Sequence, residues 1–134
     1  MAKLSGIEGI GEALEQKLKD SGISSIEALL EAGATPAGRK ALAEKSGISD
    51  KLVLKFVNHA DLMRIKGIGG EYSELLEAAG VDTVPELANR NPANLVAKMN
   101  EVNEAKKLIR RVPVESQVTD WVKQAKELPR KLTY

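Results

Sequence analysis

The sequence predicts an all-α protein, and three observations support this fold class. Hydrophobic residues make up 43% of the 134-residue chain and aromatic residues only 3%, so the core must be built mainly from Leu, Ile, Val and Ala. Apolar residues recur at helical spacing along the chain, whereas no segment keeps the alternation of a half-buried strand. Glycine, proline and short polar residues separate these apolar segments in the order that helix caps and helix stops require.

The first half of the chain contains four helical patterns, each bounded by a capping residue or a glycine. Ser24 or Ser25 caps the second helix, and Ser49 caps the fourth. Thr35 followed by Pro36 opens the third helix, because proline fits the first turn of a helix without the loss of a hydrogen bond. The predicted helices span residues 12–21, 26–32, 36–45 and 50–63.

The second half repeats this order and adds one more helix. Asp82 or Thr83 caps a short helix, and Asn91 followed by Pro92 opens the next one. We expect residues 130–134 to fray, because they follow the last helical pattern at the end of the chain. Apart from the short helix after Thr83, the predicted helices of this half span residues 70–79, 93–100, 103–112 and 115–128.

One five-residue pattern occurs twice, as Ile7-Glu8-Gly9-Ile10-Gly11 and as Ile65-Lys66-Gly67-Ile68-Gly69. We call these segments the first hairpin (residues 7–11) and the second hairpin (residues 65–69). A shift of 58 positions aligns the two hairpins and the helical patterns that follow them. This internal repeat predicts a single compact helical domain over residues 1–134, with repeats at 1–58 and 59–112 and a C-terminal helix at 114–128. The aligned apolar pairs are Leu18 with Leu76, Ile23 with Val81, Ile26 with Val84, and Leu29 with Leu87.

The composition excludes several classes of function. The chain has no cysteine and one histidine, so we expect no disulfide, no metal site and no cofactor. It has no signal peptide pattern and no run of about 18 apolar residues, so we expect a soluble cytoplasmic protein that does not enter a membrane. Because no set of nucleophile, base and orienting group is present, we predict that the protein is not an enzyme.

The two hairpins have the chemistry of an anion site. Glycines on both sides of an isoleucine allow a tight turn whose backbone N–H groups point outward at the start of a helix, and this arrangement suits a phosphate group. The pattern resembles the helix-hairpin-helix family, through Gly9, Ile10 and Gly11 in the first copy and residues 67–69 in the second. This resemblance implies binding to the phosphate backbone of duplex DNA without reading of the base sequence. The tandem arrangement also resembles an uncharacterised family of small helix-hairpin-helix proteins, over nearly the whole chain.

Acidic residues follow both hairpins and favour another interpretation. Glu12 and Glu15 follow the first hairpin, and Glu71 and Glu74 follow the second, where carboxylates repel phosphate and already satisfy the helix dipole. In this alternative the two glycines only let helices approach closely, while the central isoleucine fills the core. Basic groups lie beside the second hairpin, at Arg64 and Lys66, and Lys3 is the nearest one to the first.

Residues 39–56 resemble a bacterial helix-turn-helix, with a small residue at Ala43 and a turn at Gly47. If so, the helix from Asp50 would point Lys51, Lys55, Asn58 and His59 toward a major groove. The alternative is that two helices packed across any tight turn need the same small residue and glycine.

A basic cluster follows in the second half, within a chain whose net charge is only +1. On the predicted helix 103–112, four basic residues would share one side, although a solvated surface has the same appearance. We therefore predict a non-enzymatic module for sequence-independent binding of duplex DNA backbone; the alternative is a protein-interaction or assembly module. The predicted contact residues are Arg64, Lys66, Gly67, Ile68, Gly69 and Gly70, then Gly9 and Gly11, then Lys51 and Lys55, then Lys106, Lys107, Arg110 and Arg111.

Trp121 lies on the last predicted helix among apolar residues, and we predict that it is part of the core. The second hairpin follows a long predicted helix, but only six residues precede the first hairpin. We therefore expect the helix that carries Trp121, or a second chain, to cover the first hairpin.

Overall fold

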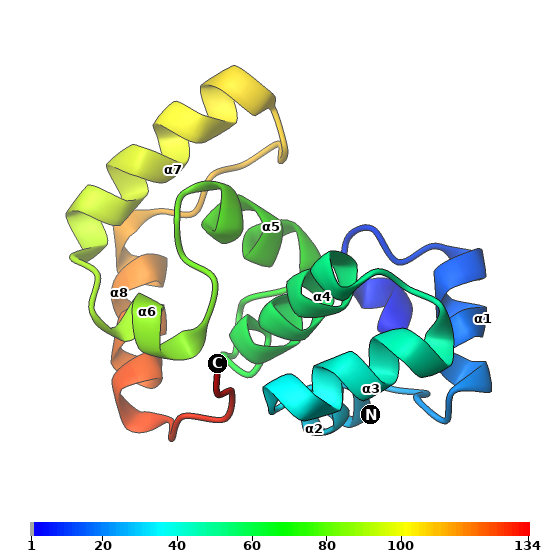
Figure 1. The fold of residues 1–134 in the computed structure, drawn as a ribbon. Helices are drawn as coiled ribbons and strands as arrows, with labels where there is room; N and C mark the ends of the chain where they lie inside the picture. Colours follow the sequence, from blue (N-terminus) through cyan, green and yellow to red (C-terminus); the bar gives the residue numbers. More distant parts are fainter. Residues whose placement is uncertain (1) are drawn as a thin grey trace. The chain divides into compact units, whose positions relative to one another are not determined.

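The structure is a computed structural model that describes residues 2–134. Met1, with which the predicted first repeat begins, lies outside the described residues. The described residues form eight α-helices and one short 3-10 helix, and they contain no strand, so the predicted all-α class is confirmed (Figure 1). In chain order the elements are η1 (Leu4–Gly6), α1 (Glu12–Asp20), α2 (Ile26–Ala32), α3 (Pro36–Ser46), α4 (Asp50–Leu62), α5 (Gly70–Ala78), α6 (Val84–Ala88), α7 (Pro92–Lys106) and α8 (Glu115–Glu127).

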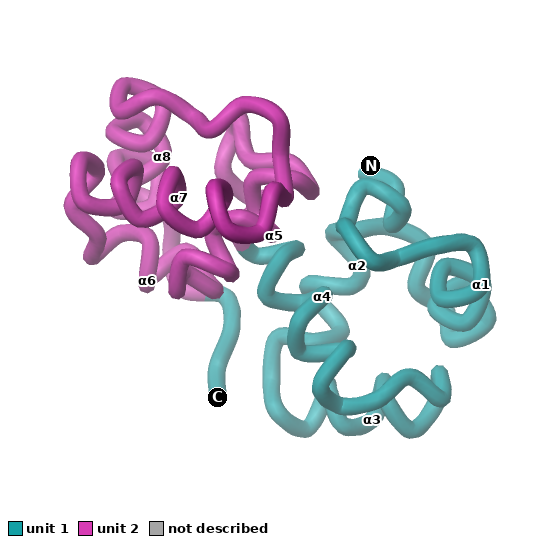
Figure 2. Tube along the Cα trace, turned by 90° about the horizontal axis from the view of Figure 1, so that it is seen from above, with its two compact units in different colours: residues 1–61, 131–134 teal, residues 62–130 magenta. Residues whose placement is uncertain are grey.

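The chain divides into two compact units (Figure 2). Unit 1 contains the chain up to Asp61 together with Lys131–Tyr134, and unit 2 contains Leu62–Arg130. Unit 1 therefore holds α1 to α3 and nearly all of α4, while unit 2 holds α5 to α8. The single compact domain over residues 1–134 stays a prediction.

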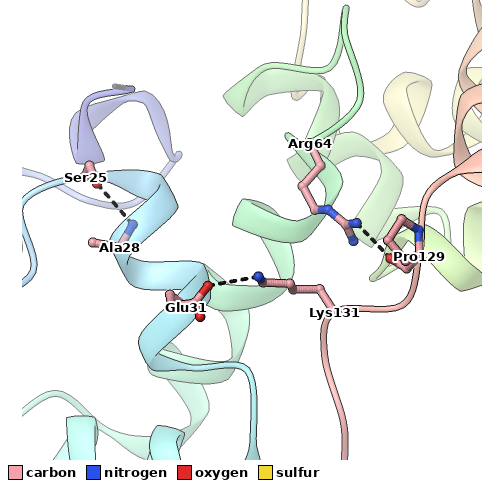
Figure 3. A network of polar contacts seen from close by, with 6 residues as sticks. All are labelled: Ser25, Ala28, Glu31, Arg64, Pro129 and Lys131. Atoms are coloured by element: carbon pink, nitrogen blue, oxygen red, sulfur yellow. Dashed lines mark hydrogen bonds and ion pairs between the residues drawn. The ribbon is translucent and has the colours of Figure 1, made fainter.

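Most of the predicted caps form, but Thr83, the N-cap residue of α6, makes no capping hydrogen bond with its side chain, and its hydroxyl donates to the Glu86 carboxylate instead. The Ser25 hydroxyl accepts a hydrogen bond of 3.0 Å from the Ala28 N–H (Figure 3), and the Thr35 hydroxyl accepts one of 3.0 Å from the Gly38 N–H. The Asn91 side chain caps α7 in the same way. These bonds satisfy N–H groups that have no partner inside the helix.

The 58-residue repeat is present in the packing of the two units. All the aligned apolar pairs are buried, and both glycine stops repeat the same backbone geometry. At the end of α1 the Ile23 N–H donates to the Leu18 carbonyl at 2.8 Å, and at the end of α5 the Val81 N–H donates to the Leu76 carbonyl at 2.8 Å. Gly22 and Gly80 have φ angles of 87° and 95°, which is the left-handed conformation of this type of helix end.

The region after Asn91 differs from the prediction of two helices at 93–100 and 103–112. α7 is one continuous helix of 15 residues, and residues 107–114 contain no helix. The helix ends because Lys107 adopts a left-handed conformation (φ 51°) and donates its N–H to the Asn103 carbonyl at 2.7 Å. The Asn103 side chain also binds both backbone polar groups of Ile109, at 3.0 Å each, and fixes the loop that follows.

In unit 1, α4 places an aromatic side chain against the first hairpin. Phe56 is 2% exposed, and a methyl group added at Gly9 would lie 3.3 Å from its Cε1 atom. Val57, also buried, occupies the space beside Gly33, where α2 ends. The first hairpin is thus covered by a helix of its own unit.

In unit 2, α8 covers the second hairpin with Trp121, so the expectation that this helix covers the first hairpin is wrong. Trp121 is 2% exposed, as predicted for a core residue, and a methyl group added at Gly67 would lie 2.9 Å from its Nε1 atom. The ring of Tyr72 packs against it with a centroid distance of 5.1 Å. α8 also packs against α6 and α7, and it is therefore the fourth helix of unit 2, as α4 is of unit 1.

The C-terminal residues pack onto unit 1, and the expectation that they fray is wrong. Leu132 is 2% exposed, and the Thr133 N–H donates to the Ala34 carbonyl at 2.9 Å. The Lys131 ammonium group lies 2.9 Å from a carboxylate oxygen of Glu31 (Figure 3). The buried leucine is the main anchor, because exposed ion pairs contribute little to stability.

We expect Leu132→Ala to lower the free energy of unfolding by roughly 2–4 kcal/mol, because it leaves a cavity where a buried leucine packs. Urea unfolding followed by circular dichroism measures this change. Thr133→Ala is the control, since Thr133 is exposed and the effect should be below about 0.5 kcal/mol. Equal unfolding curves for Leu132→Ala and the unmodified chain would instead support a frayed end.

Candidate functional site

The two hairpins have the same backbone conformation. Gly9 and Gly67 have φ angles of 95° and 103°, a region that glycine adopts without steric cost. One hydrogen bond closes the turn in each copy. The N–H of the central isoleucine donates to the carbonyl of the isoleucine three residues before it. The distance is 3.2 Å in the first hairpin and 3.1 Å in the second. The repeat seen in the sequence is therefore a repeat of structure.

The central isoleucine of each hairpin points into the core. Ile10 and Ile68 are each 5% exposed, whereas the glycines on both sides of them are exposed. Each hairpin thus buries its two isoleucine side chains and exposes its glycine backbone. This geometry is compatible with both interpretations of the pattern, a packing role and an anion site. The isoleucines pack in the core, and the glycine backbone is exposed.

Helices α1 and α5 start directly after the hairpins without a side-chain cap. Gly11 and Gly69 are the N-cap residues, and neither can offer a side-chain acceptor. The first N–H groups of a helix have no partner within the helix, and the helix dipole makes this end positive. The starts of α1 and α5 can therefore accept an anion if neighbouring charges permit it.

Neighbouring charges at the first hairpin are mostly acidic. Glu8 and Glu12 are exposed beside its glycines, and Glu15 lies half-buried in the first turn of α1. Lys3 is exposed, as predicted for the nearest basic residue. These carboxylates make the first hairpin a poor site for a phosphate.

The second hairpin has an exposed lysine and a fixed backbone. Lys66 is exposed, and its backbone N–H donates to the Gln124 side-chain oxygen at 2.9 Å. The Gln124 amide donates in turn to the Lys66 carbonyl at 3.1 Å, so α8 holds the turn from both sides. Sequence reasoning missed Gln124, because no local pattern links a residue of α8 to a turn 58 positions earlier.

Arg64 has a structural role in addition to its predicted place beside the second hairpin. Its side chain is half-buried, and its guanidinium group donates to the Pro129 carbonyl at 2.7 Å (Figure 3). This bond holds the backbone just after α8. Lys66 is therefore the better candidate for contact with a ligand.

A pocket lies beside the start of α5. It has a volume of about 520 Å³, and we call it the loop pocket. Its three basic residues belong to the predicted cluster, but they lie on the loop after α7 rather than on one side of a helix. Lys106, the fourth residue of that cluster, does not line the pocket. The lining residues are Glu71, Tyr72, Lys107, Leu108, Ile109, Arg110 and Arg111.

The predicted groove-reading face of α4 is not available as a whole. Lys51 is exposed and Lys55 half-buried, but Asn58 is 7% exposed and His59 is fully buried. The Asn58 side chain accepts a hydrogen bond of 2.7 Å from the Tyr134 hydroxyl. The predicted presentation of Asn58 and His59 to a groove is wrong, because the stripe of α4 that faces the core is wider than expected.

Two further features bear on the class of site. Within the described part of the chain, no group of three or more His, Cys, Asp or Glu side chains is arranged to hold a metal ion. Over the same residues, none of the helices combines the length and the apolar character needed to cross a membrane.

The fold and the hairpins define an all-α protein of two repeated four-helix units, each with a glycine turn that opens toward solvent. The chain belongs to a family whose members share a domain of unknown function, DUF4332, and the family model matches residues 8–128. A search of curated proteins and a search of solved structures each found no match.

Proposed function

We propose that the protein is a non-enzymatic helix-hairpin-helix module that binds the phosphate backbone of duplex DNA without reading base sequence. One observation carries this proposal: the loop pocket places three basic side chains, Lys107, Arg110 and Arg111, beside the first turn of α5. The second hairpin is the centre of the proposed interface, with Lys66 and the N–H groups of Gly67, Gly69 and Gly70 as further contacts, since the Ile68 N–H already donates to the Ile65 carbonyl within the turn.

The basic side chains of the loop pocket favour a phosphate ligand beside the second hairpin, whereas the carboxylates of Glu71 and Glu74 on α5 oppose one. The loop pocket contains three basic side chains and one carboxylate, that of Glu71. Arginine can bind a phosphate through two parallel hydrogen bonds, and backbone N–H groups at a helix start add to them. Contacts of this kind fix a protein on a duplex but carry no information about base sequence.

We expect labelled duplex DNA to bind in fluorescence anisotropy, with an affinity that falls roughly a hundredfold between about 50 mM and about 200 mM salt, the slope for three to four phosphate contacts. Lys66→Gln should reduce the slope of log K against log salt by about 1, because it removes one of these contacts. Lys3→Gln, beside the acidic first hairpin, is the matched control and should leave the slope unchanged. Absence of binding at about 50 mM salt would contradict the proposal.

The first hairpin favours a second candidate, a protein-interaction or assembly module. Its exposed residues Glu8 and Glu12 discourage a phosphate and suit a basic protein surface. Size-exclusion chromatography with light scattering tests self-association directly. A concentration-dependent dimer that Glu12→Gln weakens, in a protein that binds no DNA, would favour this candidate over DNA binding.

A further inference from the structure

The loop pocket is held in shape before any ligand binds. Its loop starts at Lys107, whose left-handed conformation turns the chain away from α7. Ile109, in the middle of the loop, is 9% exposed, and Asn103 fixes its backbone N–H and carbonyl at 3.0 Å each. The basic side chains on either side of this anchor are exposed. A loop anchored in this way loses less conformational entropy on binding than a free one.

The loop pocket also has the size to hold a compact anion, in addition to the backbone contacts proposed for its basic side chains. A volume of about 520 Å³ lies within the usual range of small-molecule sites. Three basic side chains around one cavity match the charge of a phosphate monoester, about −1.5 to −2 at pH 7, better than the single charge of a phosphodiester. A monoester also presents three acceptor oxygens to its donors, and basic residues can surround it from several sides.

We propose that the loop pocket binds the phosphate monoester at the end of a nucleic-acid strand, with Lys107, Arg110 and Arg111 as its ligands. This proposal rests on the proposed function, since it takes nucleic acid to be the source of the phosphate. Tyr72 forms one wall of the pocket, and its ring is supported by Trp121 at a centroid distance of 5.1 Å. A half-buried ring of this kind is a surface on which the terminal base stacks.

The experiment compares duplexes of one sequence that differ only at their ends, at about 50 mM salt. The ligands are a closed circular duplex, a linear duplex with 5′-hydroxyl ends, and linear duplexes with 5′-phosphate or 3′-phosphate ends. We expect at least one phosphorylated end to bind about tenfold more tightly than the hydroxyl end, which is the effect of one or two charge-assisted hydrogen bonds. A nucleoside monophosphate is added as a competitor, and displacement of the phosphorylated linear duplex by it at equal concentration would identify a free nucleotide as the ligand and overturn the proposal.

The outcomes separate this proposal from the proposed function. Equal binding of circular, hydroxyl-ended and phosphorylated duplexes supports backbone binding and overturns the end-binding proposal. Binding of phosphorylated ends alone supports end binding and overturns binding along the duplex. Binding of no nucleic acid overturns both.

Three variants locate the effect in the loop pocket. Arg110→Gln should abolish the preference for a phosphorylated end, whereas Lys106→Gln, at the last residue of α7 and outside the pocket, should preserve it. Glu71→Gln removes the carboxylate of the pocket and should strengthen binding of phosphorylated ends by a few-fold. Equal losses for Arg110→Gln and Lys106→Gln would show a general charge effect and contradict the proposal. Circular dichroism spectra confirm that each variant is folded.

Discussion

Trp121→Ala is expected to lower the free energy of unfolding by roughly 3–5 kcal/mol, the largest loss among the substitutions considered. Trp121 is 2% exposed, packs against the ring of Tyr72 and fills the space beside Gly67. Its removal leaves a cavity between α8 and the second hairpin, and the surrounding backbone can collapse only in part. Urea unfolding monitored by circular dichroism measures the loss.

Hydrogen exchange locates the effect of this substitution in the chain. Loss of protection after Trp121→Ala should be concentrated in residues 62–130, the unit that Trp121 helps to form. Val114→Ala is the control, because Val114 is 58% exposed at the start of the same helix and its loss should cost below about 0.5 kcal/mol. Loss of protection around the first hairpin alone would show that α8 covers that hairpin and would contradict the packing described for unit 2.

The helix boundaries were predictable where local chemistry sets them. Ser25 and Thr35 accept the hydrogen bonds expected of N-caps, and Gly22 and Gly80 end their helices in the left-handed conformation. Each of these signals acts within a few residues of the helix end, so a single sequence contains it in full. The all-α class followed from the same local patterns.

Features that depend on contacts beyond the adjacent helical turn were not predictable. The end of α7 is set by Asn103 and the backbone of Ile109, and an asparagine in a helical pattern gives no sign of such a contact. The burial of His59 and Leu132 likewise depends on packing between segments that are far apart in the sequence. Hydrophobic periodicity predicts that a face is buried, but it does not identify what lies against that face.

The two aromatic residues explain why the last helix was assigned to the wrong hairpin. Phe56 and Trp121 have equivalent places, each against the first glycine of a hairpin, yet they lie 65 positions apart rather than 58. The seven additional positions in the second unit shift its fourth helix out of the alignment. An alignment with a fixed shift of 58 positions therefore gave α8 no equivalent in the first half. In the structure its equivalent is α4, the fourth helix of unit 1.

The candidate site was predicted in part. Lys66 and the glycines of the second hairpin are exposed as expected, and three of the four clustered basic residues line one pocket. The reason given for that cluster, a shared helical side, was wrong, since Lys107 ends α7. The pocket itself could not be predicted, because it depends on where Tyr72 lies relative to the loop after α7. No spacing in the sequence indicates that position.

Gly67→Ala is expected to lower the free energy of unfolding by about 2–4 kcal/mol. The φ angle of 103° is unfavourable for any residue with a Cβ atom, and the added methyl group would lie 2.9 Å from Trp121 Nε1. Trp121 cannot move aside without disturbing the core, because it is almost fully buried. The substitution therefore combines backbone strain with overpacking at one position. Thermal or urea unfolding measures the change.

Gly69→Ala, two residues later in the same hairpin, is the matched control for this prediction. Gly69 has a φ angle of −105°, and an added methyl group would meet no atom within 4 Å. Alanine is a poor N-cap, so a loss of at most about 1 kcal/mol is expected there. A similar loss at Gly67 and Gly69 would mean that the hairpin relaxes freely and that Trp121 does not fix it. A large loss at Gly67 alone would instead show that the second hairpin tolerates a side chain at its exposed position Gly69 but not beside Trp121.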